Sequence, residues 1–338
     1  MKVVFWISLV LLCFANAASA QWLRQTVVTN ASLRGLSVVS ESIIWASGTG
    51  GTVIKSTDGG KSWQVMTVPG AERLDFRDIE AFDASTAYIL SVGNGHFSRI
   101  YKTSDGGITW TEQFRNKDEK AFYDAIACWD RDNCIALSDP VDELFRLIIT
   151  NDGGRSWRFA SRDKMPRAMA AEAAFAASGT CLIVNGKTDS FFVTGGSEAR
   201  VFRSKDRGLT WLVARAPIAK GTAGSGVFSI AMRDANHGLI VGGNYEKPDD
   251  AEANLAFTKD GGRTWKAARG LSGYRSGIAF VDRKTVIAVG ASGTDLSRDG
   301  GKTWKKIGAE NLNAVAAHGR RAVWAVGPGG MVVKLKSK

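Results

Sequence analysis

The stretch Ser56-Thr57-Asp58-Gly59-Gly60-Lys61-Ser62-Trp63 recurs along the chain and determines the fold that we expect. Five further copies keep the same spacing, with a Trp five residues after an Asp. The Asp and Trp pairs of the six copies are Asp58 and Trp63, Asp105 and Trp110, Asp152 and Trp157, Asp206 and Trp211, Asp260 and Trp265, and Asp299 and Trp304. Six copies with one spacing indicate a repeat architecture.

Each copy has the chemistry of a tight turn followed by an anchored strand. The Asp carboxylate can accept hydrogen bonds from backbone N–H groups a few residues ahead. Glycine at the following positions tolerates positive φ values. The Trp opens the next strand with a large apolar face to bury. We therefore interpret these Asp and Trp residues as structural.

The sequence between the copies repeats one order of strands. The six Asp positions are separated by 47, 47, 54, 54 and 39 residues. In the first repeat we expect strands over 35–39, 43–48 and 52–56, and a fourth that begins at Ser62-Trp63. Four short strands in about 40 to 50 residues are typical of a β-propeller blade.

A seventh repeat near the C-terminal end supplies three strands, over 312–316, 322–327 and 331–334. The N-terminal stretch Gln21 to Gln25 contains Trp22, which matches the Trp that opens each fourth strand. We expect this stretch to complete the last blade, because closing the ring removes an exposed sheet edge. The predicted fold is all-β: one seven-bladed β-propeller with four-stranded blades over residues 21–338.

The first twenty residues have the pattern of a secretory signal peptide. Lys2 precedes an apolar run from Val3 to Phe14, and Ala18-Ser19-Ala20 is an A-x-A cleavage sequence. We predict cleavage after Ala20 and export to the periplasm or the extracellular space. The alternative is an uncleaved membrane anchor, which the shortness of the apolar run disfavours.

Charge and composition restrict the partners. The chain has 44 Lys and Arg residues and 33 Asp and Glu residues, a formal net charge of +11. The positive charges are scattered, which indicates a solvated basic surface that can meet acidic partners or anionic lipid. We do not expect a nucleic-acid partner for an exported chain, and we expect a monomer.

Cys128 and Cys134 flank a turn-like stretch between two apolar runs. In an oxidising compartment they could close a hairpin as a disulfide, and the sequence leaves this possibility and two free thiols equally open. Cys181 lies in an apolar strand, where we expect a buried, inert thiol.

The sequence contains no pattern of a catalytic, metal or cofactor site. His96, His237 and His318 are isolated, so they predict neither a metal cluster nor a catalytic triad. The Gly-Gly pairs lack the spacing of a phosphate-binding loop, and no dinucleotide-binding unit can be placed. We therefore predict no cofactor.

Propeller topology sorts the loops onto two faces. The Asp turns join the third and fourth strands, so they lie together on one face, here called the bottom face. The start of each first strand and the loop between the second and third strands lie on the opposite face, the top face. Binding residues are usually presented by loops on a rigid scaffold, so we expect a site at the top.

Several polar and aromatic residues are candidates for this site. The candidates at the starts of first strands are Arg34, Arg77, Tyr123, Arg275 and Asn313. The candidates in the loops between second and third strands are Asp139, Asp142, Asn244, Tyr245 and Lys247, with Asn94, His96, Lys187 and Asp189 as further members. Because blades six, seven, one and two are contiguous in a closed ring, the three arginines should form an arc near the channel mouth. The opposite side should be acidic and aromatic.

An alternative is that these arginines pair with nearby carboxylates and only line a solvated channel. The carboxylates considered for that role are Asp78, Asp124 and Glu172.

The repeated Ser/Thr-x-Asp-Gly-Gly-x-Thr/Ser-Trp unit resembles the Asp-box (BNR) repeats of bacterial sialidases. The segment Ala322-Val323-Trp324-Ala325-Val326-Gly327, ahead of a Gly and a third strand, resembles the photosystem II stability/assembly factor family and its relatives in non-photosynthetic bacteria. That resemblance implies an exported seven-bladed propeller that serves as a non-catalytic scaffold for protein interaction or complex assembly. It also implies an arginine-rich patch that holds a protein or peptide segment, including an acidic or membrane-protein partner.

The alternative function is carbohydrate chemistry, as a glycoside hydrolase or a glycan-binding module. Similarity to sialidases would imply three arginines, a Tyr nucleophile with a Glu partner and an acid/base Asp. The Arg-Ile-Pro motif that carries the first such arginine is absent from this sequence. Two carboxylates about 5–10 Å apart in a top-face pocket would favour the hydrolase.

Overall fold

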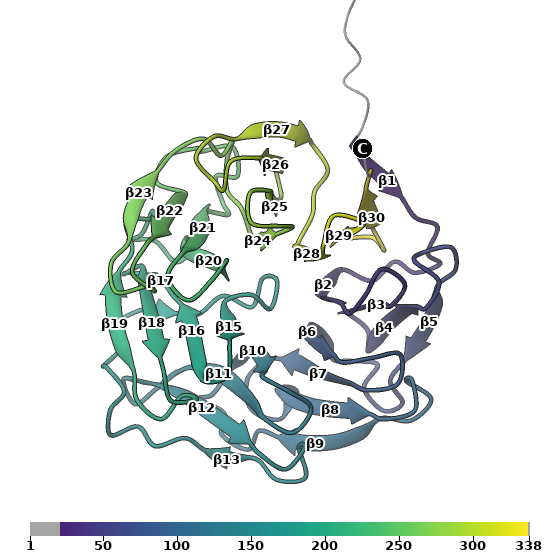
Figure 1. Cartoon of the computed structure of the whole chain (residues 1–338). Coiled ribbons are helices and arrows are strands. Elements are labelled where there is room, and N and C mark those ends of the chain that lie inside the picture. The colour runs from purple at the N-terminus through teal and green to yellow at the C-terminus, as the bar shows by residue number, and fades with distance from the viewer. Residues whose placement is uncertain (1–20, 337–338) are drawn as a thin grey trace, which may run out of the picture.

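The computed structural model of this protein describes residues 21–336 as a closed ring of seven antiparallel sheets around a central axis (Figure 1). This arrangement confirms the predicted seven-bladed β-propeller. The signal-peptide prediction falls on residues 1–20, which lie outside the described residues. Within 21–336 the one helix is the 3-10 turn η1 (Gly95–Phe97), and no helix is long and apolar enough to cross a bilayer.

The first four blades follow one another along the chain. Blade one consists of β2 (Leu33–Val38), β3 (Ile44–Gly48), β4 (Thr52–Ser56) and β5 (Gln64–Thr67). Blade two consists of β6 (Asp75–Ala81), β7 (Ala87–Val92), β8 (Arg99–Thr103) and β9 (Thr111–Arg115). Blade three consists of β10 (Tyr123–Cys128), β11 (Cys134–Val141), β12 (Leu144–Thr150) and β13 (Arg158–Phe159). Blade four consists of β15 (Leu182–Asn185), β16 (Asp189–Val193), β18 (Arg200–Ser204) and β19 (Leu212–Arg215).

The remaining blades include two short extra strands and the N-terminal strand. Blade five consists of β20 (Ser225–Met232), β21 (Gly238–Asn244), β22 (Leu255–Thr258) and β23 (Lys266–Ala268). The strands β14 (Glu172–Ala173) and β17 (Gly195–Gly196) extend its inner edge. Blade six consists of β24 (Gly277–Phe280), β25 (Val286–Gly290), β26 (Gly293–Ser297) and β27 (Lys305–Gly308). Blade seven consists of β28 (Ala314–His318), β29 (Ala322–Val326), β30 (Val332–Leu335) and β1 (Trp22–Arg24).

The strand β1 closes the ring, as predicted. It pairs antiparallel with β30, with Trp22 opposite Leu335, and the two strands lie side by side in Figure 1. The Trp22 side chain is buried, and its Nε1–H donates a hydrogen bond to Oγ1 of Thr294 in blade six at 3.0 Å. The first strand of the described chain is therefore bonded to the last strand and to the neighbouring blade.

The Asp turns are held by one repeated set of hydrogen bonds. In blade one, Oδ1 of Asp58 accepts from the Ser62 N–H at 3.0 Å, and its Oδ2 accepts from Oγ of Ser62 at 2.6 Å. Oγ of Ser56 accepts from the Gly60 N–H at 2.9 Å, and Gly60 has a φ of 89°. These hydrogen bonds to the carboxylate lower the pKa of Asp58 to about 2. The Asp is therefore an ionised turn component.

Adjacent blades are joined by a cation at four of the junctions. In each case a Lys or Arg of a third strand donates to the carbonyl of the first Gly in the next Asp turn. The pairs are Lys55 with Gly106 (2.7 Å), Lys102 with Gly153 (2.8 Å), Arg203 with Gly261 (2.9 Å) and Lys334 with Gly59 (3.4 Å). In the cross-strand register these cations lie opposite Trp45, Tyr88, Phe191 and Trp324 of the second strands. We call this aromatic–cation arrangement a latch.

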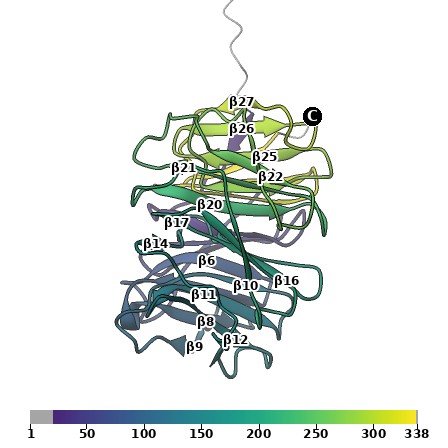
Figure 2. The same ribbon diagram turned by 90° about the vertical axis from the view of Figure 1, so that its left-hand side faces the viewer.

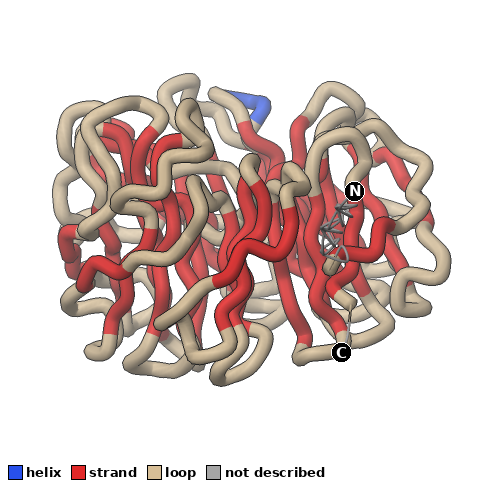
Figure 3. The backbone as a smooth tube through the Cα atoms, turned by 90° about the horizontal axis from the view of Figure 1, so that it is seen from above, coloured by secondary structure: helices blue, strands red, loops and turns tan. Residues whose placement is uncertain are grey.

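The two faces of the disc differ as the topology requires, and Figures 2 and 3 show the blades from the side. The turn η1 lies on the upper edge in Figure 3, so that edge is the top face. Lys187 and Asp189 were expected on the top face, and the structure corrects this. They lie at the hairpin between β15 and β16, the first and second strands of blade four, and therefore on the bottom face.

Candidate functional site

The candidate site is the top end of the central channel, where six blades each direct one side chain inward from the first strand or from the residue just before it. In blades one, two, three and five this residue lies at a β-bulge, where the pairing with the second strand shifts. The six channel-lining residues are Arg34, Arg77, Asp124, Phe228, Ser276 and Asn313. All six line one cavity of about 560 Å³. A bulge redirects a side chain, which accounts for the inward direction of the four residues in blades one, two, three and five.

Tyr123 and Arg275 were expected at the channel mouth, and the structure places both in the interior instead. Tyr123 is 1% exposed, and its ring packs edge-on against Phe114 at 5.3 Å. Arg275 is fully buried and forms an ion pair with Asp295 at 2.6 Å. Each residue precedes the inward-facing residue by one position, and successive side chains of a strand point to opposite faces. The predicted arc therefore contains two arginines, with Ser276 in place of the third.

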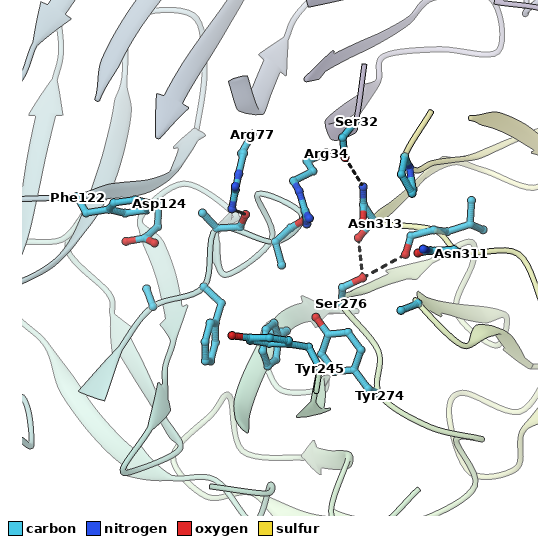
Figure 4. Close-up of a pocket in the computed structure, with 18 of the residues that line it drawn as sticks. Ser32, Arg34, Arg77, Phe122, Asp124, Tyr245, Tyr274, Ser276, Asn311 and Asn313 are labelled. Carbon is cyan, nitrogen blue, oxygen red and sulfur yellow. Dashed lines mark hydrogen bonds between the residues drawn. The ribbon is translucent and has the colours of Figure 1, made fainter. Parts of the chain in front are cut away.

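The cavity has a cationic side and an aromatic side (Figure 4). Arg34 and Arg77 project from blades one and two, and the rings of Tyr245 and Tyr274 lie opposite them in Figure 4. Tyr245 belongs to the loop after β21 and is 48% exposed, so it forms the outer part of this wall. The prediction was a cationic side opposite an acidic and aromatic side, and the rings of Tyr245 and Tyr274 are what faces the arginines.

The two arginines bind main-chain carbonyls. Nη1 of Arg34 donates to the Ala177 carbonyl at 3.1 Å, and Nη1 of Arg77 donates to the Ala176 carbonyl at 3.3 Å. Nε of Arg77 also donates to Asp75 at 2.7 Å. Within residues 21–336, Arg34 forms no ion pair with a carboxylate. Burial, and secondarily the charge of Arg77, lower the pKa of Arg34 from its usual value.

The carboxylates considered as arginine partners have other roles. Glu172 accepts from Nε of Arg200 at 2.8 Å. Asp78 accepts from the backbone N–H groups of Ile79 and Ile126 at 2.9 and 2.8 Å. The guanidinium groups at the channel mouth are therefore not neutralised by these two acids.

A segment that precedes blade four spans the channel and was not predicted. Its residues 174–177 line the cavity and receive the two arginine hydrogen bonds described above. The Ala174 N–H donates to Oδ1 of Asp139 at 2.8 Å, and the Phe175 ring stacks on Phe228 with centroids 3.9 Å apart. Ser178 donates to the Ser276 carbonyl at 2.8 Å. The protein thus holds a turn of its own backbone at the channel mouth.

Asp124 and Asp139 bring two carboxyl groups to the same cavity. Asp124 is 1% exposed and its Oδ2 has no hydrogen-bond partner among the described residues. Burial, and then the proximity of Asp139, raise the pKa of Asp124 well above its usual value. Burial also raises the pKa of Asp139 to about 6. Both carboxyl groups of this pair are therefore protonated more readily than an ordinary aspartate.

The other predicted residues of the top face lie outside this cavity. Asp142 is exposed at the hairpin after β11 and pairs with Lys120 at 3.3 Å. Oδ1 of Asn244 accepts from the Glu246 N–H at 2.9 Å and shapes its own loop. Lys247 is exposed and is not among the residues that line the cavity. These residues surround the mouth without converging on it.

Two further candidates lie around η1. Nδ2 of Asn94 donates to the Glu119 carbonyl at 3.2 Å, and the exposed His96 ring contacts Phe97. Among residues 21–336, no three His, Cys, Asp or Glu side chains gather as a metal site.

The described cysteines form one disulfide and one buried free thiol. Cys128 and Cys134 face one another across β10 and β11 and form a disulfide with an S–S distance of 1.99 Å. Cys181 is a buried free thiol, and burial raises its pKa well above the usual value. A thiol that stays protonated is a poor nucleophile.

Comparison with known proteins agrees with this architecture. Residues 296–306 match the family model of the BNR/Asp-box repeat. The comparison with curated proteins finds no match. The structure is similar to "YCF48 bound to D1 peptide", with a TM-score of 0.69 and 16% identity over 94% of this chain and 97% of that chain.

Two other solved structures share the fold. YCF48 from Cyanidioschyzon merolae has a TM-score of 0.63 and 18% identity, over 94% of this chain and 99% of that chain. The WD40 repeats of RRP9 have a TM-score of 0.63 and 14% identity, over 94% and 98%. The resemblance stated from the sequence is therefore confirmed for the Asp-box repeat and for the propeller shared with YCF48.

Proposed function

We propose that this protein is an exported, non-catalytic scaffold that holds a peptide segment of a partner protein at the top of its channel. One observation carries the proposal: Arg34 and Arg77 already bind two backbone carbonyls of a loop segment beside an aromatic wall. Backbone carbonyls are common to every peptide, and arginine presents its donors in a rigid fork. A solved relative in fold is described as bound to a D1 peptide, which supports peptide binding as the function.

The chemistry of the cavity indicates what such a peptide carries. Arg34 lacks a carboxylate partner among the described residues, so an acidic side chain beside it would be favoured. Tyr245 and Tyr274 supply flat apolar surface on the opposite side, with Phe228 behind them. Aromatic residues and arginine are the residues enriched at the energetic centres of protein interfaces. The preferred segment therefore has an acidic residue close to an apolar or aromatic one.

Export is part of this proposal. The signal-peptide pattern of residues 1–20 supports it, and the Cys128–Cys134 disulfide is typical of an oxidising compartment. Fractionation with an antibody and N-terminal sequencing of the mature protein test it. A mature chain that begins at Gln21 supports export, whereas a full-length cytosolic chain contradicts it.

The binding proposal is tested with a displayed random peptide library panned against the folded protein. We expect enrichment of peptides with an acidic residue near an aromatic one. Arg34→Met combined with Arg77→Met should lower the affinity for the selected peptides by roughly 10- to 100-fold, since charge-assisted hydrogen bonds are lost. The matched control is Arg155→Met with Arg263→Met, two exposed arginines of bottom-face Asp turns. Equal losses of peptide affinity in the two double variants would show that the peptides do not bind at the top face.

Carbohydrate hydrolysis is a second candidate, because Asp124 and Asp139 share the cavity and have raised pKa values. A general acid needs a raised pKa, which favours this candidate. The burial of Asp124 disfavours it, and one oxygen of Asp139 is already engaged by the Ala174 N–H. Turnover of a fluorogenic glycoside panel that is abolished by Asp124→Asn would establish hydrolysis and overturn the non-catalytic scaffold.

A further inference from the structure

The junction between blades five and six lacks the latch found at four other junctions. At the latch positions, blade five has Leu239 opposite Phe257, where blade one has Trp45 opposite Lys55. The aromatic ring of the second strand is therefore missing, and so is the cation of the third strand. Within residues 21–336 no Lys or Arg side chain donates to the Gly300 carbonyl, which corresponds to the latched carbonyls.

A cavity of about 580 Å³ occupies this junction on the bottom face. Leu239, Phe257, Phe280 and Ala268 give it apolar walls, and the Asp turn of blade six closes one side. Leu239 packs directly under Gly301 of that turn, at the place where Trp324 packs under Gly60 in blade one. The smaller side chain leaves room that a ring fills elsewhere. The volume lies in the range of small-molecule sites, about 300–1,000 Å³.

The rim of this cavity is cationic. Arg233, Lys259, Arg269 and Lys302 line it. Over residues 21–336, Lys259, Arg269 and Lys302 form no ion pair.

Among the described residues, the acidic side chains at this cavity do not form ion pairs with Lys259, Arg269 or Lys302 at its rim. Asp299 is the one acid among the lining residues, and both of its oxygens accept hydrogen bonds within its own turn, from Ser297, Thr303 and the Lys302 N–H. Nearby Asp234 is engaged by Arg233 and His237. The lysines and Arg269 are therefore available to an anionic ligand.

We propose that this cavity is a second binding site, for a small aromatic carboxylate. The aromatic ring would occupy the volume that a Trp, Tyr or Phe ring occupies at the latched junctions, against Leu239, Phe257 and Phe280. The carboxylate would meet Lys259, Arg269 and Lys302 at the rim. Lys259 already lies 5.6 Å from the Phe257 ring centroid, so a cation is in place over aromatic surface. The site is on the face opposite the channel mouth and does not depend on the proposed peptide binding.

The first test uses 2-naphthoate and its neutral analogue 2-naphthalenemethanol as probes, with titration calorimetry on the folded protein. We expect saturable binding of the carboxylate, and binding of the alcohol that is weaker by about 10-fold, because the alcohol lacks the charge-assisted contacts. The triple change of Lys259→Met, Arg269→Met and Lys302→Met should remove that difference while leaving the fold intact, since all three side chains are exposed. Absence of saturable binding, or equal affinity for acid and alcohol, would overturn the proposal.

The second test fills the cavity from within the protein. Leu239→Trp combined with Phe257→Lys recreates the aromatic–cation pair of blade one at this junction, and should abolish 2-naphthoate binding without lowering the Tm. The matched control makes the same change in blade three, with Ile135→Trp and Ile149→Lys, a cross-strand pair at the corresponding position. Retained 2-naphthoate binding in the filled variant would show that the probe binds elsewhere and would contradict the site.

Discussion

Asp78 is a carboxyl group that lies one residue after Arg77 and points away from the cavity that Arg77 lines. It is 5% exposed and bridges blades two and three by accepting the N–H group of Ile126. Burial raises its pKa to about 7, against the opposing effect of the two backbone N–H groups that it accepts. The alternation of side chains along β6 therefore places one charge at the surface of the channel and one buried acid with a raised pKa inside the ring.

The pKa of Asp78 predicts a pH-dependent stability. The folded pKa of Asp78 lies above the unfolded value of about 3.9. Its contribution to the free energy of unfolding is therefore complete below pH ~4 and is lost as the pH rises through about 7. The total is a few kcal/mol, at about 1.4 kcal/mol for each pKa unit. Urea denaturation between pH 4.5 and 8 should show a flatter dependence for Asp78→Asn than for the wild type. The exposed control Asp142→Asn should keep the wild-type slope; identical slopes for all three proteins would contradict the assignment.

At the scale of elements, the propeller is assembled by contacts between the second and third strands of one blade and the Asp turn of the next. In blade two, Nζ of Lys102 donates to the Gly153 carbonyl at 2.8 Å and lies 4.9 Å from the ring centroid of Tyr88. Tyr88 in turn packs under Gly154 and donates its hydroxyl hydrogen to the Arg131 carbonyl. The glycines of the Asp turns therefore serve two purposes: they allow the turn, and they admit the neighbouring ring.

Removal of one latch should destabilise the protein. We expect Lys102→Met to lower the free energy of unfolding by about 1–2 kcal/mol, through the lost hydrogen bond and the lost cation–π contact, because the methionine keeps the apolar stem. Equilibrium urea denaturation measures the change. The control is Lys61→Met, an exposed lysine within an Asp turn, which should stay within about 0.5 kcal/mol of the wild type. A loss no larger than that of the control would argue against the latch.

At the scale of the whole molecule, ring closure depends on three residues at one end of the described chain. The strand β1 covers the edge of β30, and Trp22 inserts between blades six and seven. An uncovered β30 would present unpaired backbone groups, which favour pairing with another chain. Closure of the ring by β1 therefore affects both the stability and the oligomeric state of the protein.

Truncation of the closing side chain tests this role. Trp22→Ala should cost about 3–5 kcal/mol, as is usual for buried aromatic side chains, and should shift part of the protein to dimers or larger species. Thermal unfolding and size-exclusion chromatography measure the two effects. Leu23→Ala, on the exposed side of the same strand, is the control and should behave as the wild type. A monomeric Trp22→Ala variant with an unchanged Tm would show that β1 does not close the ring.

The candidate site was only partly predictable from the sequence. Arg34, Arg77, Asn313, Asp139 and Tyr245 line the cavity, whereas Tyr123 and Arg275 are buried because each lies one residue before the inward-facing position. A pattern in the sequence does mark the inward position: the channel residue precedes a small or short residue and then an aliphatic one, as in Arg34-Gly35-Leu36 and Ser276-Gly277-Ile278. The segment over 174–177 has no such pattern, since its position depends on hydrogen bonds to residues of other blades.

The sequence by itself determined the number of blades, the Asp turns and the closure of the ring, because these depend on local hydrogen bonds and on a repeated pattern of apolar residues. The tertiary structure alone decided which side chains share a cavity. Arg34, Asp124 and Tyr245 come from different blades, and a bulge of one residue reverses the direction of a side chain. It also decided that Leu239 opposite Phe257 leaves a gap, since an empty volume exists only where two packed blades fail to fill the space between them.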